Sequence, residues 1–126
     1  FPTPENAAEF LALLRSARSV LVASHLNPDG DAIGASLAMS YALDQLGVRH
    51  EVVNHNPVPF NLRFLAGGER IQPASTQDHD LGIVLDLNTL DRLGSHLESF
   101  AALDPLIVID HHQPSDPLGT LRLVDV

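Results

Sequence analysis

Three short, branched apolar runs constrain the fold of this chain more than any other feature. They cover residues 20–24, 81–85 and 106–109, and weaker runs cover 50–54 and 121–124. Short, continuously apolar runs are typical of strands that are buried on both faces, as in parallel sheets. Because stretches with helical periodicity separate the runs, the sequence predicts an α/β fold, a mostly parallel sheet with helices on both faces.

Helices are predicted over residues 4–17, 32–46, 60–65 and 89–100. Thr3 is a typical N-cap for the first helix, and Asp31 can cap the second. Gly94 weakens the prediction for the last helix, because glycine is unfavourable inside helices. The segment 71–80 is polar and rich in turn-forming residues, and it is predicted to be a loop.

Composition limits the classes of function. The 126 residues suffice for a single domain, over 1–126, with a hydrophobic core. Asp and Glu total 16 against 7 basic residues, all of them arginine, and the net charge is -9. Without a basic patch, the chain should not bind a nucleic-acid backbone by charge alone. An acidic domain that handles phosphates needs metal ions to reverse its local field.

The sequence has no cysteine, which excludes disulfides and thiolate zinc sites. No segment is long and apolar enough to span a membrane, and the first residues lack the pattern of a signal peptide. A cytoplasmic enzyme with no membrane partner is therefore predicted. Because the chain begins without Met and ends within a predicted strand, we expect it to be a piece of a longer protein.

Potential metal ligands follow each of the three apolar runs. They are His25, Asp29, Asp31, Asp86, Asp110, His111 and His112. Ligands in open parallel sheets bind beyond the carboxyl ends of the strands, so these side chains are expected to converge at one edge. Imidazole and carboxylate ligands together suit manganese, iron or zinc better than calcium. Seven potential ligands are more than one metal ion needs. They suit two ions, with Asp86 as the ligand that both ions share.

Two adjacent metal ions point to one class of reaction. Paired ions clamp the attacking and leaving oxygens of an in-line phosphoryl displacement and lower the pKa of a shared water. A further histidine can hold the phosphate or protonate the leaving oxygen. Metal-assisted hydrolysis of a phosphate ester is therefore the predicted chemistry.

Each of these segments also has a simpler interpretation when it is considered alone. The segment 29–31 is a common turn before a helix, Asp86 can simply end a strand, and 110–112 can begin a polar loop. Their combination in one chain favours the functional interpretation.

Other histidines are predicted to be structural or solvated. The triplet 78–80 precedes a strand, so it is expected in a solvated turn at the opposite edge of the sheet.

His50 and His55 flank the second predicted strand, and His96 lies on a predicted helix. All three are expected at the surface or at the rim of the domain.

Three motifs resemble a known family. "HLNPDGDAIGASLA", "LDLNTLDRLG" and "VIDHH" are similar, in order and approximate spacing, to the first three motifs of the DHH phosphoesterases. The similarity extends from about Val20 to His112. The first motif most resembles the nanoRNase and adenosine 3′,5′-bisphosphate phosphatase branch. The resemblance implies a DHH-type N-terminal domain.

The resemblance also implies the metal ligands and the native metal. His25 and Asp29 would bind one manganese ion, and Asp31 and His111 would bind the other, with Asp86 bridging them. Two Mn²⁺ ions are expected in each site, with Mg²⁺ or Co²⁺ as substitutes.

Further roles follow from the same resemblance. His112 would contact the scissile phosphate, and Asp110 would orient its neighbours, so that His112, Asp86 and Asp110 form the catalytic group. Asn27 and Arg92 also fall at motif positions, where substrate-binding roles are expected.

The activity implied is that of the N-terminal catalytic domain of a manganese-dependent phosphoesterase. Its substrates would be short oligoribonucleotides, dinucleotides or adenosine 3′,5′-bisphosphate. The alternatives are a pyrophosphatase, a single-strand exonuclease of the same family, or a catalytically silent nucleotide-binding regulatory module.

The family also has a fourth metal-ligand Asp and a C-terminal DHH-associated domain, beyond the third motif. Asp125 lies too close to that motif to be the ligand, and the chain lacks the second domain. We therefore expect the chain to be truncated before the fourth motif and to be inactive or weak alone. Short RNA or a nucleotide and the missing domain are its expected partners, and the resemblance allows for a homodimer.

Overall fold

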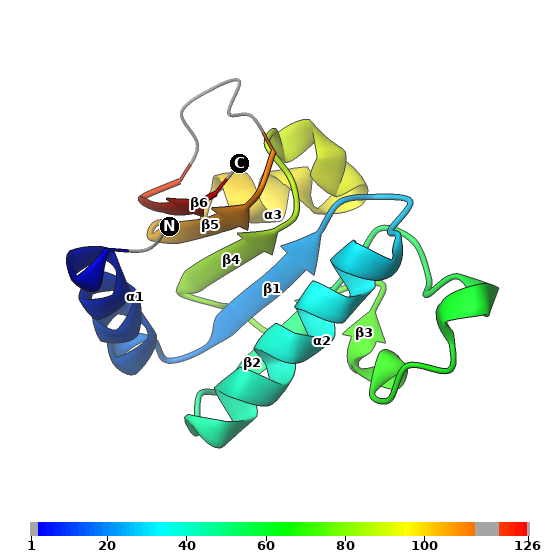
Figure 1. Cartoon of the computed structure of the whole chain (residues 1–126), viewed down its shortest axis with the longest axis horizontal. Coiled ribbons are helices and arrows are strands. Elements are labelled where there is room, and N and C mark those ends of the chain that lie inside the picture. Colours follow the sequence, from blue (N-terminus) through cyan, green and yellow to red (C-terminus); the bar gives the residue numbers. More distant parts are fainter. Residues whose placement is uncertain (1–2, 113–118, 126) are drawn as a thin grey trace.

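The computed structural model describes residues 3–112 and 119–125 and shows a single parallel sheet (Figure 1). Its strands are β1 (Val20–Ser24), β2 (His50–Val53), β3 (Ile71–Gln72), β4 (Leu81–Leu85), β5 (Leu106–Asp110) and β6 (Leu121–Val124). Their order across the sheet is β3-β2-β1-β4-β5-β6, and each neighbouring pair is parallel. The α/β fold predicted from the sequence is confirmed.

Helices cover both faces of this sheet. The helical segments are α1 (Pro4–Ser16), α2 (Gly30–Gln45), η1 (Phe60–Leu62), η2 (Gly68–Arg70), η3 (Leu90–His96) and α3 (Leu97–Ala101), of which those marked η are 3-10 helices. Leu14 of α1 and Leu43 of α2 pack with Val22 and Ile83 on one face. Phe100 of α3 packs with the alternate strand residues, such as Val84, on the other face.

The central strands β1 and β4 are buried along their whole length, as their continuous apolar sequences predict. They pair in register, with Val20 opposite Leu81 and Ser24 opposite Leu85, so both strands end at the same level.

Thr3 caps α1 as predicted, since its hydroxyl accepts a hydrogen bond from the Asn6 amide at 3.1 Å.

The cap of α2 differs from the prediction. Asp29, rather than Asp31, is the N-cap, and its carboxylate accepts a hydrogen bond from the Ala32 amide at 2.9 Å. Asp31 instead lies in the first turn, where a carboxylate interacts favourably with the helix dipole. The two carboxylates therefore lie at the same helix end but face different neighbours.

Three secondary-structure predictions were wrong in detail. The predicted loop 71–80 begins with the two-residue strand β3, which pairs with β2 at the edge of the sheet. The predicted helix 89–100 is split into η3 and α3, because Gly94 has a φ of 62° and a ψ of -123°. The predicted helix 60–65 is reduced to the single turn η1. Local sequence patterns did not specify these short, irregular segments.

The segment 78–80 lies at the opposite edge as predicted, but His79 is not solvated. Its side chain is only 2% exposed. The Nδ1 atom lies 2.8 Å from the Ser19 hydroxyl, and Nε2 lies 2.9 Å from a Glu51 carboxylate oxygen. Asp80 accepts hydrogen bonds from the amides of Arg18 and Ser19. This cluster of polar groups fastens the start of β1 to the loop before β4.

The other histidines divide between surface and interior. His55 is exposed, as predicted. His96 is buried, and burial lowers the pKa of its ring. The side chain of His50 is also largely enclosed, with its Nε2 2.7 Å from the Ser40 hydroxyl. The prediction of a surface or rim position was wrong for His96, because neighbouring segments cover it in the fold, whereas half-buried His50 is consistent with a rim position. Within residues 3–112 and 119–125, no helix is long and apolar enough to cross a bilayer.

Two glycines provide a matched test of the packing. A Cβ at Gly82 of β4 would lie 2.8 Å from a Leu106 methyl carbon and 3.0 Å from one of Leu103. At Gly34, inside α2, a Cβ would meet no atom within 4 Å. We expect Gly82→Val to lower the free energy of unfolding by about 1–3 kcal/mol, because the core there is already filled. Gly34→Ala should raise it by up to about 1 kcal/mol. Urea unfolding checks both, and equal effects of the two substitutions would contradict this packing.

Candidate metal centre

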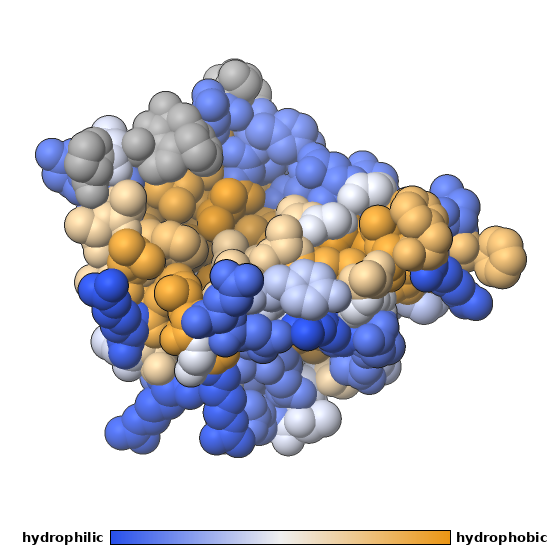
Figure 2. Space-filling model, turned by 60° about the horizontal axis from the view of Figure 1, so that its bottom comes forward, coloured by the Kyte–Doolittle hydropathy of each residue, from blue (hydrophilic) through white to orange (hydrophobic). Residues whose placement is uncertain are grey.

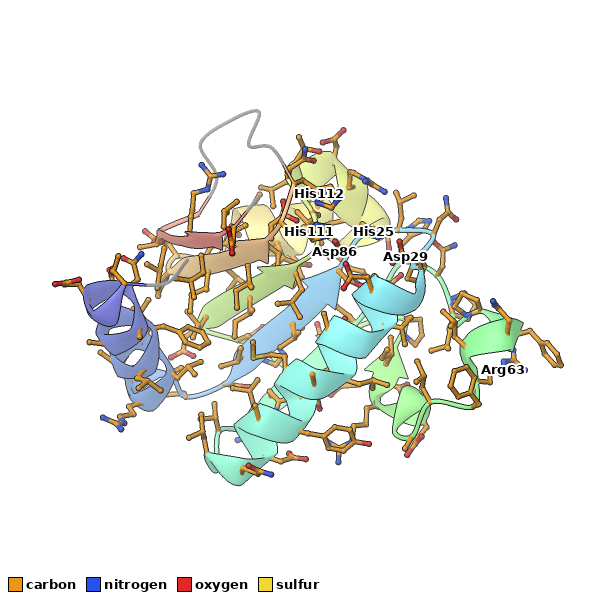
Figure 3. All side chains as sticks on the ribbon, viewed as in Figure 1. His25, Asp29, Arg63, Asp86, His111 and His112 are labelled. Carbon is orange, nitrogen blue, oxygen red and sulfur yellow. The ribbon has the colours of Figure 1, made fainter. Side chains whose placement is uncertain are left out.

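The potential metal ligands lie together at the carboxyl edge of the sheet, around the ends of β1, β4 and β5 (Figure 3). His25 directly follows β1, Asp86 directly follows β4, and His111 and His112 directly follow β5. Figure 3 shows these side chains with Asp29, at the start of α2, around one small volume. Residues separated by more than eighty sequence positions therefore meet because the strands are parallel and in register.

One group of ligand atoms comes from His25, Asp29 and Asp86. The Nε2 atom of His25 lies 3.3 Å from Asp86 Oδ2 and 3.7 Å from Asp29 Oδ1. Its Nδ1 atom is 2.7 Å from the carbonyl oxygen of Leu26, to which it can donate. That hydrogen bond fixes the ring and leaves Nε2 as the free, electron-donating nitrogen.

The second group comes from Asp86, Asp110, His111 and His112. His111 Nε2 lies 2.9 Å from Asp86 Oδ1 and 3.0 Å from Asp31 Oδ2. His112 Nδ1 lies 2.5 Å from Asp110 Oδ1 and 3.9 Å from Asp86 Oδ1. Asp86 belongs to both groups, and its two carboxylate oxygens face different histidines. This arrangement is the one that a carboxylate shared by two ions would need.

Electrostatics at Asp86 favour a cation. Its side chain is 6% exposed, and burial together with the negative charge of Asp31 raises the pKa of its carboxyl group. The hydrogen bond from the Ala32 amide lowers the pKa of Asp29, which stays ionised. The hydrogen bond to Asp86 raises the pKa of His111. Among the described residues these carboxylates have only histidines as ion-pair partners, and a divalent cation would relieve their mutual repulsion.

Backbone strain accompanies this site. Asp86 has a φ of 60° and Asn27 has a φ of 51°, in the left-handed region that most residues avoid. The Asp86 amide nevertheless donates to the Ile109 carbonyl at 3.0 Å, which ties the end of β4 to β5. Such strained backbone is concentrated at functional sites, where surrounding structure holds it in place.

Sequence reasoning missed Asn54, the residue that holds the His25 loop. Its side-chain amide donates to the Ser24 hydroxyl at 3.0 Å and to the His25 carbonyl at 3.1 Å. Its side-chain oxygen accepts from the Asn56 amide, and Asn56 in turn accepts from the Asn27 amide at 2.7 Å. The sequence did contain a signal for Asn54. It is a polar residue directly after strand β2, just as Asp86 directly follows β4.

The structure does not bring every predicted residue into the cluster. Asp31, a predicted metal ligand, belongs to neither group of ligand atoms, although it contacts His111, and the predicted substrate-binding residues Asn27 and Arg92 are exposed. Arg92 supports the site through its backbone, because its carbonyl accepts a hydrogen bond from the Leu26 amide at 2.7 Å. Asp125 lines a cavity of about 270 Å³ together with Asp31, Asp86 and His111. Its carboxylate is not among the grouped ligand atoms of the described residues.

These residues fit a divalent metal by the chemistry of their donors. In each group the ligand atoms lie within 4.8 Å of one another. Carboxylate oxygens and imidazole nitrogens are the mixture that manganese and similar ions accept. Buried Asp86 and His25 form the floor, whereas Asp29, Asp31 and His111 are more than half exposed at the rim. An ion could therefore be reached from solvent.

Comparison with known proteins shows the family of this chain. The model for the "DHH family, N-terminal domain" matches residues 19–124. The chain belongs to the DHH family. Its matched region contains every strand and every predicted ligand, so the resemblance inferred from the three motifs is confirmed.

Relatives of this DHH domain have differing names. It is 32% identical, over 84% of its length, to the bifunctional oligoribonuclease and PAP phosphatase NrnA of Thermus thermophilus, and it covers 32% of that protein. It is 31% identical, over 79% of its length, to a probable manganese-dependent inorganic pyrophosphatase of Bacillus cytotoxicus, and it covers 34% of that protein. The DHH domain thus spans about a third of the length of the curated relatives it matches.

A solved structure has the same fold. An exopolyphosphatase-related protein from Bacteroides fragilis superposes with a TM-score of 0.89 and 26% sequence identity. The match covers 98% of this chain and 39% of that one.

Removing the shared carboxylate tests the metal centre. We expect Asp86→Asn to weaken manganese binding at least about 100-fold, since Asp86 contributes to both groups of ligand atoms. Asparagine tolerates a positive φ, so the substitution changes the charge while keeping the backbone. Calorimetric titration of the full-length protein with Mn²⁺ measures the effect, with Asp78→Asn as an exposed control. Equal affinities for Asp86→Asn and wild type would contradict this centre.

Metal binding should also depend on pH. The pKa of Asp86 and that of His111 are both raised, and a ligand must lose its proton to bind a metal. Manganese affinity should therefore rise from about pH 5 to pH 8 and then level off. In His111→Gln the rise near neutral pH should be smaller. Titrations across this range check the effect, and a pH-independent affinity in the wild type would be inconsistent with it.

Proposed function

We propose that this DHH domain binds two divalent cations, with Mn²⁺ as the native metal, and hydrolyses phosphate esters. The supporting observation is the position of Asp86, whose two carboxylate oxygens face His111 and His25 in two separate groups. In this proposal His25 and Asp29 hold one ion, Asp31 and His111 hold the other, and Asp86 is shared. Mg²⁺ or Co²⁺ are expected to substitute.

Metal ions in such a site supply an activated water and neutralise charge on the phosphate. The protein itself supplies a fixed, partly buried floor and a rim that stays open to solvent. Because Asp86 and His25 are enclosed, charge interactions there are screened less than at the surface. In this proposal the enclosed Asp86 and the exposed carboxylates at the rim together hold the cations, and the open rim admits the substrate.

His112 is the proposed contact to the scissile phosphate. Its Nδ1 is held by Asp110, so in the imidazolium form, which has a proton on each nitrogen, Nε2 can donate a hydrogen bond to a phosphate oxygen or a proton to the leaving oxygen. The His112 side chain is 38% exposed and so accessible, whereas that of Asp110 is 3% exposed. Asp110 therefore acts as a positioning residue for His112. Asn27 and Arg92 are proposed to contact the substrate from the exposed rim.

Short oligoribonucleotides, dinucleotides and adenosine 3′,5′-bisphosphate are the proposed substrates. Support comes from the motif "HLNPDGDAIG" and from NrnA-type relatives that are named as oligoribonucleases and PAP phosphatases. Since the chain spans about a third of those relatives, we propose that a C-terminal DHH-associated domain completes the substrate site. A cytoplasmic location is proposed for the whole protein.

Pyrophosphate hydrolysis is the second candidate. Relatives at 30–31% identity are named as probable manganese-dependent inorganic pyrophosphatases. The same carboxylates and histidines would serve this reaction, so the geometry of the metal centre does not separate the two candidates. The first motif favours the nucleotide substrates.

A substrate panel on the full-length protein with Mn²⁺ tests this proposal. We expect phosphate release from adenosine 3′,5′-bisphosphate and stepwise shortening of a short oligoribonucleotide. Asp86→Asn should lower turnover at least about 100-fold, and the exposed control Asp78→Asn should leave it unchanged. His112→Gln should lower kcat by about 100-fold or more while manganese still binds. A variant that binds manganese but turns over slowly would separate metal binding from the chemical step.

Each contrary outcome has a defined meaning. Wild-type turnover in Asp86→Asn would exclude the shared-carboxylate centre. Cleavage of pyrophosphate alone would select the second candidate. Manganese binding without turnover of any substrate would indicate a silent nucleotide-binding module.

A further inference from the structure

The amino edge of the sheet holds a cavity lined by positive charge. The last turns of α1 and α2 meet at this edge, where β1 and β2 begin, opposite the candidate metal centre (Figure 1). Between them lies a cavity of about 290 Å³, and Arg15, Arg18 and Arg49 all line it. These are three of the seven basic residues of a chain whose net charge is -9. The fold therefore gathers cations from the ends of two helices around one cavity.

The guanidinium groups of these three arginines are available to an anion. Each arginine is exposed, and in the part of the chain that the structure describes none of them forms an ion pair. Arg70, by contrast, is paired with Asp44. Arg49 donates a hydrogen bond to the neutral side chain of Gln77 at 2.7 Å, which leaves its charge unbalanced. No acidic side chain is among the described residues that line the cavity.

Two acidic side chains near this edge are already engaged with other groups. Asp80 accepts hydrogen bonds from the backbone amides of Arg18 and Ser19, each at 3.0 Å. Glu51 lies 2.9 Å from Nε2 of His79. These carboxylates serve the backbone and a buried ring, so the arginine side chains are left to a ligand.

The floor of the cavity is apolar. Leu14 lies buried there, and Leu11 and Leu46 line the cavity with 37% and 55% of their surface exposed. Figure 2 brings this end of the molecule forward and shows apolar surface among strongly hydrophilic side chains. An apolar hollow with a few polar groups around it is typical of small-molecule sites, whose volumes begin at about 300 Å³.

The combination of charge and apolar surface specifies a class of ligand. A phosphomonoester carries close to two negative charges at neutral pH, and guanidinium groups bind phosphate oxygens through pairs of hydrogen bonds. The apolar floor suits a flat ring attached to that phosphate. A nucleoside monophosphate has both parts. An extended nucleic-acid strand, by contrast, would need a longer row of cations than one cavity provides.

We propose that this cavity binds a nucleoside monophosphate without the help of a metal ion. The phosphate lies among the three arginines, and the base lies on Leu11 and Leu46. The Val20 amide donates to the Arg49 carbonyl at 2.9 Å, which ties together the two turns that carry Arg18 and Arg49, so the site exists before the ligand binds. The inference does not rest on the proposed function, because it involves none of the candidate metal ligands.

Calorimetric titration of the full-length protein with adenosine 5′-monophosphate (AMP) in EDTA tests the site. The chelator removes metal ions, so the metal centre does not contribute to the binding of phosphate. We expect a dissociation constant below about 1 mM for AMP. Inorganic phosphate should bind more weakly, and adenosine should show no detectable binding, because each has only one of the two parts.

A matched pair of arginine variants locates the binding. Arg18→Gln should weaken AMP binding at least about tenfold, since it removes charge-assisted hydrogen bonds to the phosphate. Arg63→Gln removes the same charge from an exposed arginine outside the cavity and should leave the affinity unchanged. Circular dichroism of both variants checks that the fold is retained.

A second pair of variants tests the floor. Leu46→Asp should weaken AMP binding at least about tenfold, because it places a carboxylate beside the phosphate. Leu46→Asn has nearly the same shape without the charge, and should weaken binding by no more than about threefold. Leu46 is more than half exposed, so neither change is expected to unfold the domain.

Four results would overturn this site. One is the absence of AMP binding at concentrations up to about 10 mM. Another is an equal loss of affinity in Arg18→Gln and Arg63→Gln, which would show only the effect of net charge. Inorganic phosphate that binds as tightly as AMP would show that the apolar floor has no part. An oligoribonucleotide that binds far more tightly than AMP, and loses affinity in Arg18→Gln, would assign the arginines to a nucleic-acid strand.

Discussion

Asp86 is a buried carboxylate between two histidines, close to other acidic side chains, at the end of one of the two central strands. Burial and the charge of Asp31 both raise its pKa, so the folded domain holds an electrostatic strain at this point. A cation relieves that strain more effectively than a proton, because it interacts with all of the surrounding carboxylates at once. His25, His111 and Asp29 all lie around the Asp86 carboxylate. The rest of the structure serves to keep Asp86 buried and to bring its partners to it.

The parallel sheet performs that task. β1, β4 and β5 lie side by side in register, so the residues that follow them emerge at one edge. Cores on both faces fix the strands, and the turn into α2 adds Asp29 and Asp31 from a rigid helix end. Asn54 then locks the His25 loop to the end of β2. The candidate ligands are therefore preorganised by backbone that is itself buried or hydrogen-bonded, which would limit the rearrangement needed to bind a metal.

The two ends of the strands have different roles. The carboxyl edge brings acids and histidines together as a candidate metal centre, whereas at the amino edge His79, Glu51 and Asp80 form structural hydrogen bonds. Histidine and aspartate occur at both edges, and burial, partners and strand polarity distinguish their roles. The same residue types thus have different roles according to the end of the strand at which they lie.

The sequence by itself determined the sheet class, five of the six strands nearly to the residue, and the edge of the sheet at which the potential metal ligands meet. Continuous apolar runs define buried strands, and the polarity of parallel strands places whatever follows them at one edge. Tertiary structure alone decided the rest. β3 is two residues long and exists only because β2 is beside it. Gly94 adopts a positive φ and divides the predicted helix. Asp29 replaces Asp31 as the cap, and His79 and His96 are enclosed by segments distant in sequence. Short elements, caps and the burial of polar side chains depend on contacts between distant segments, and a local sequence pattern does not contain those contacts.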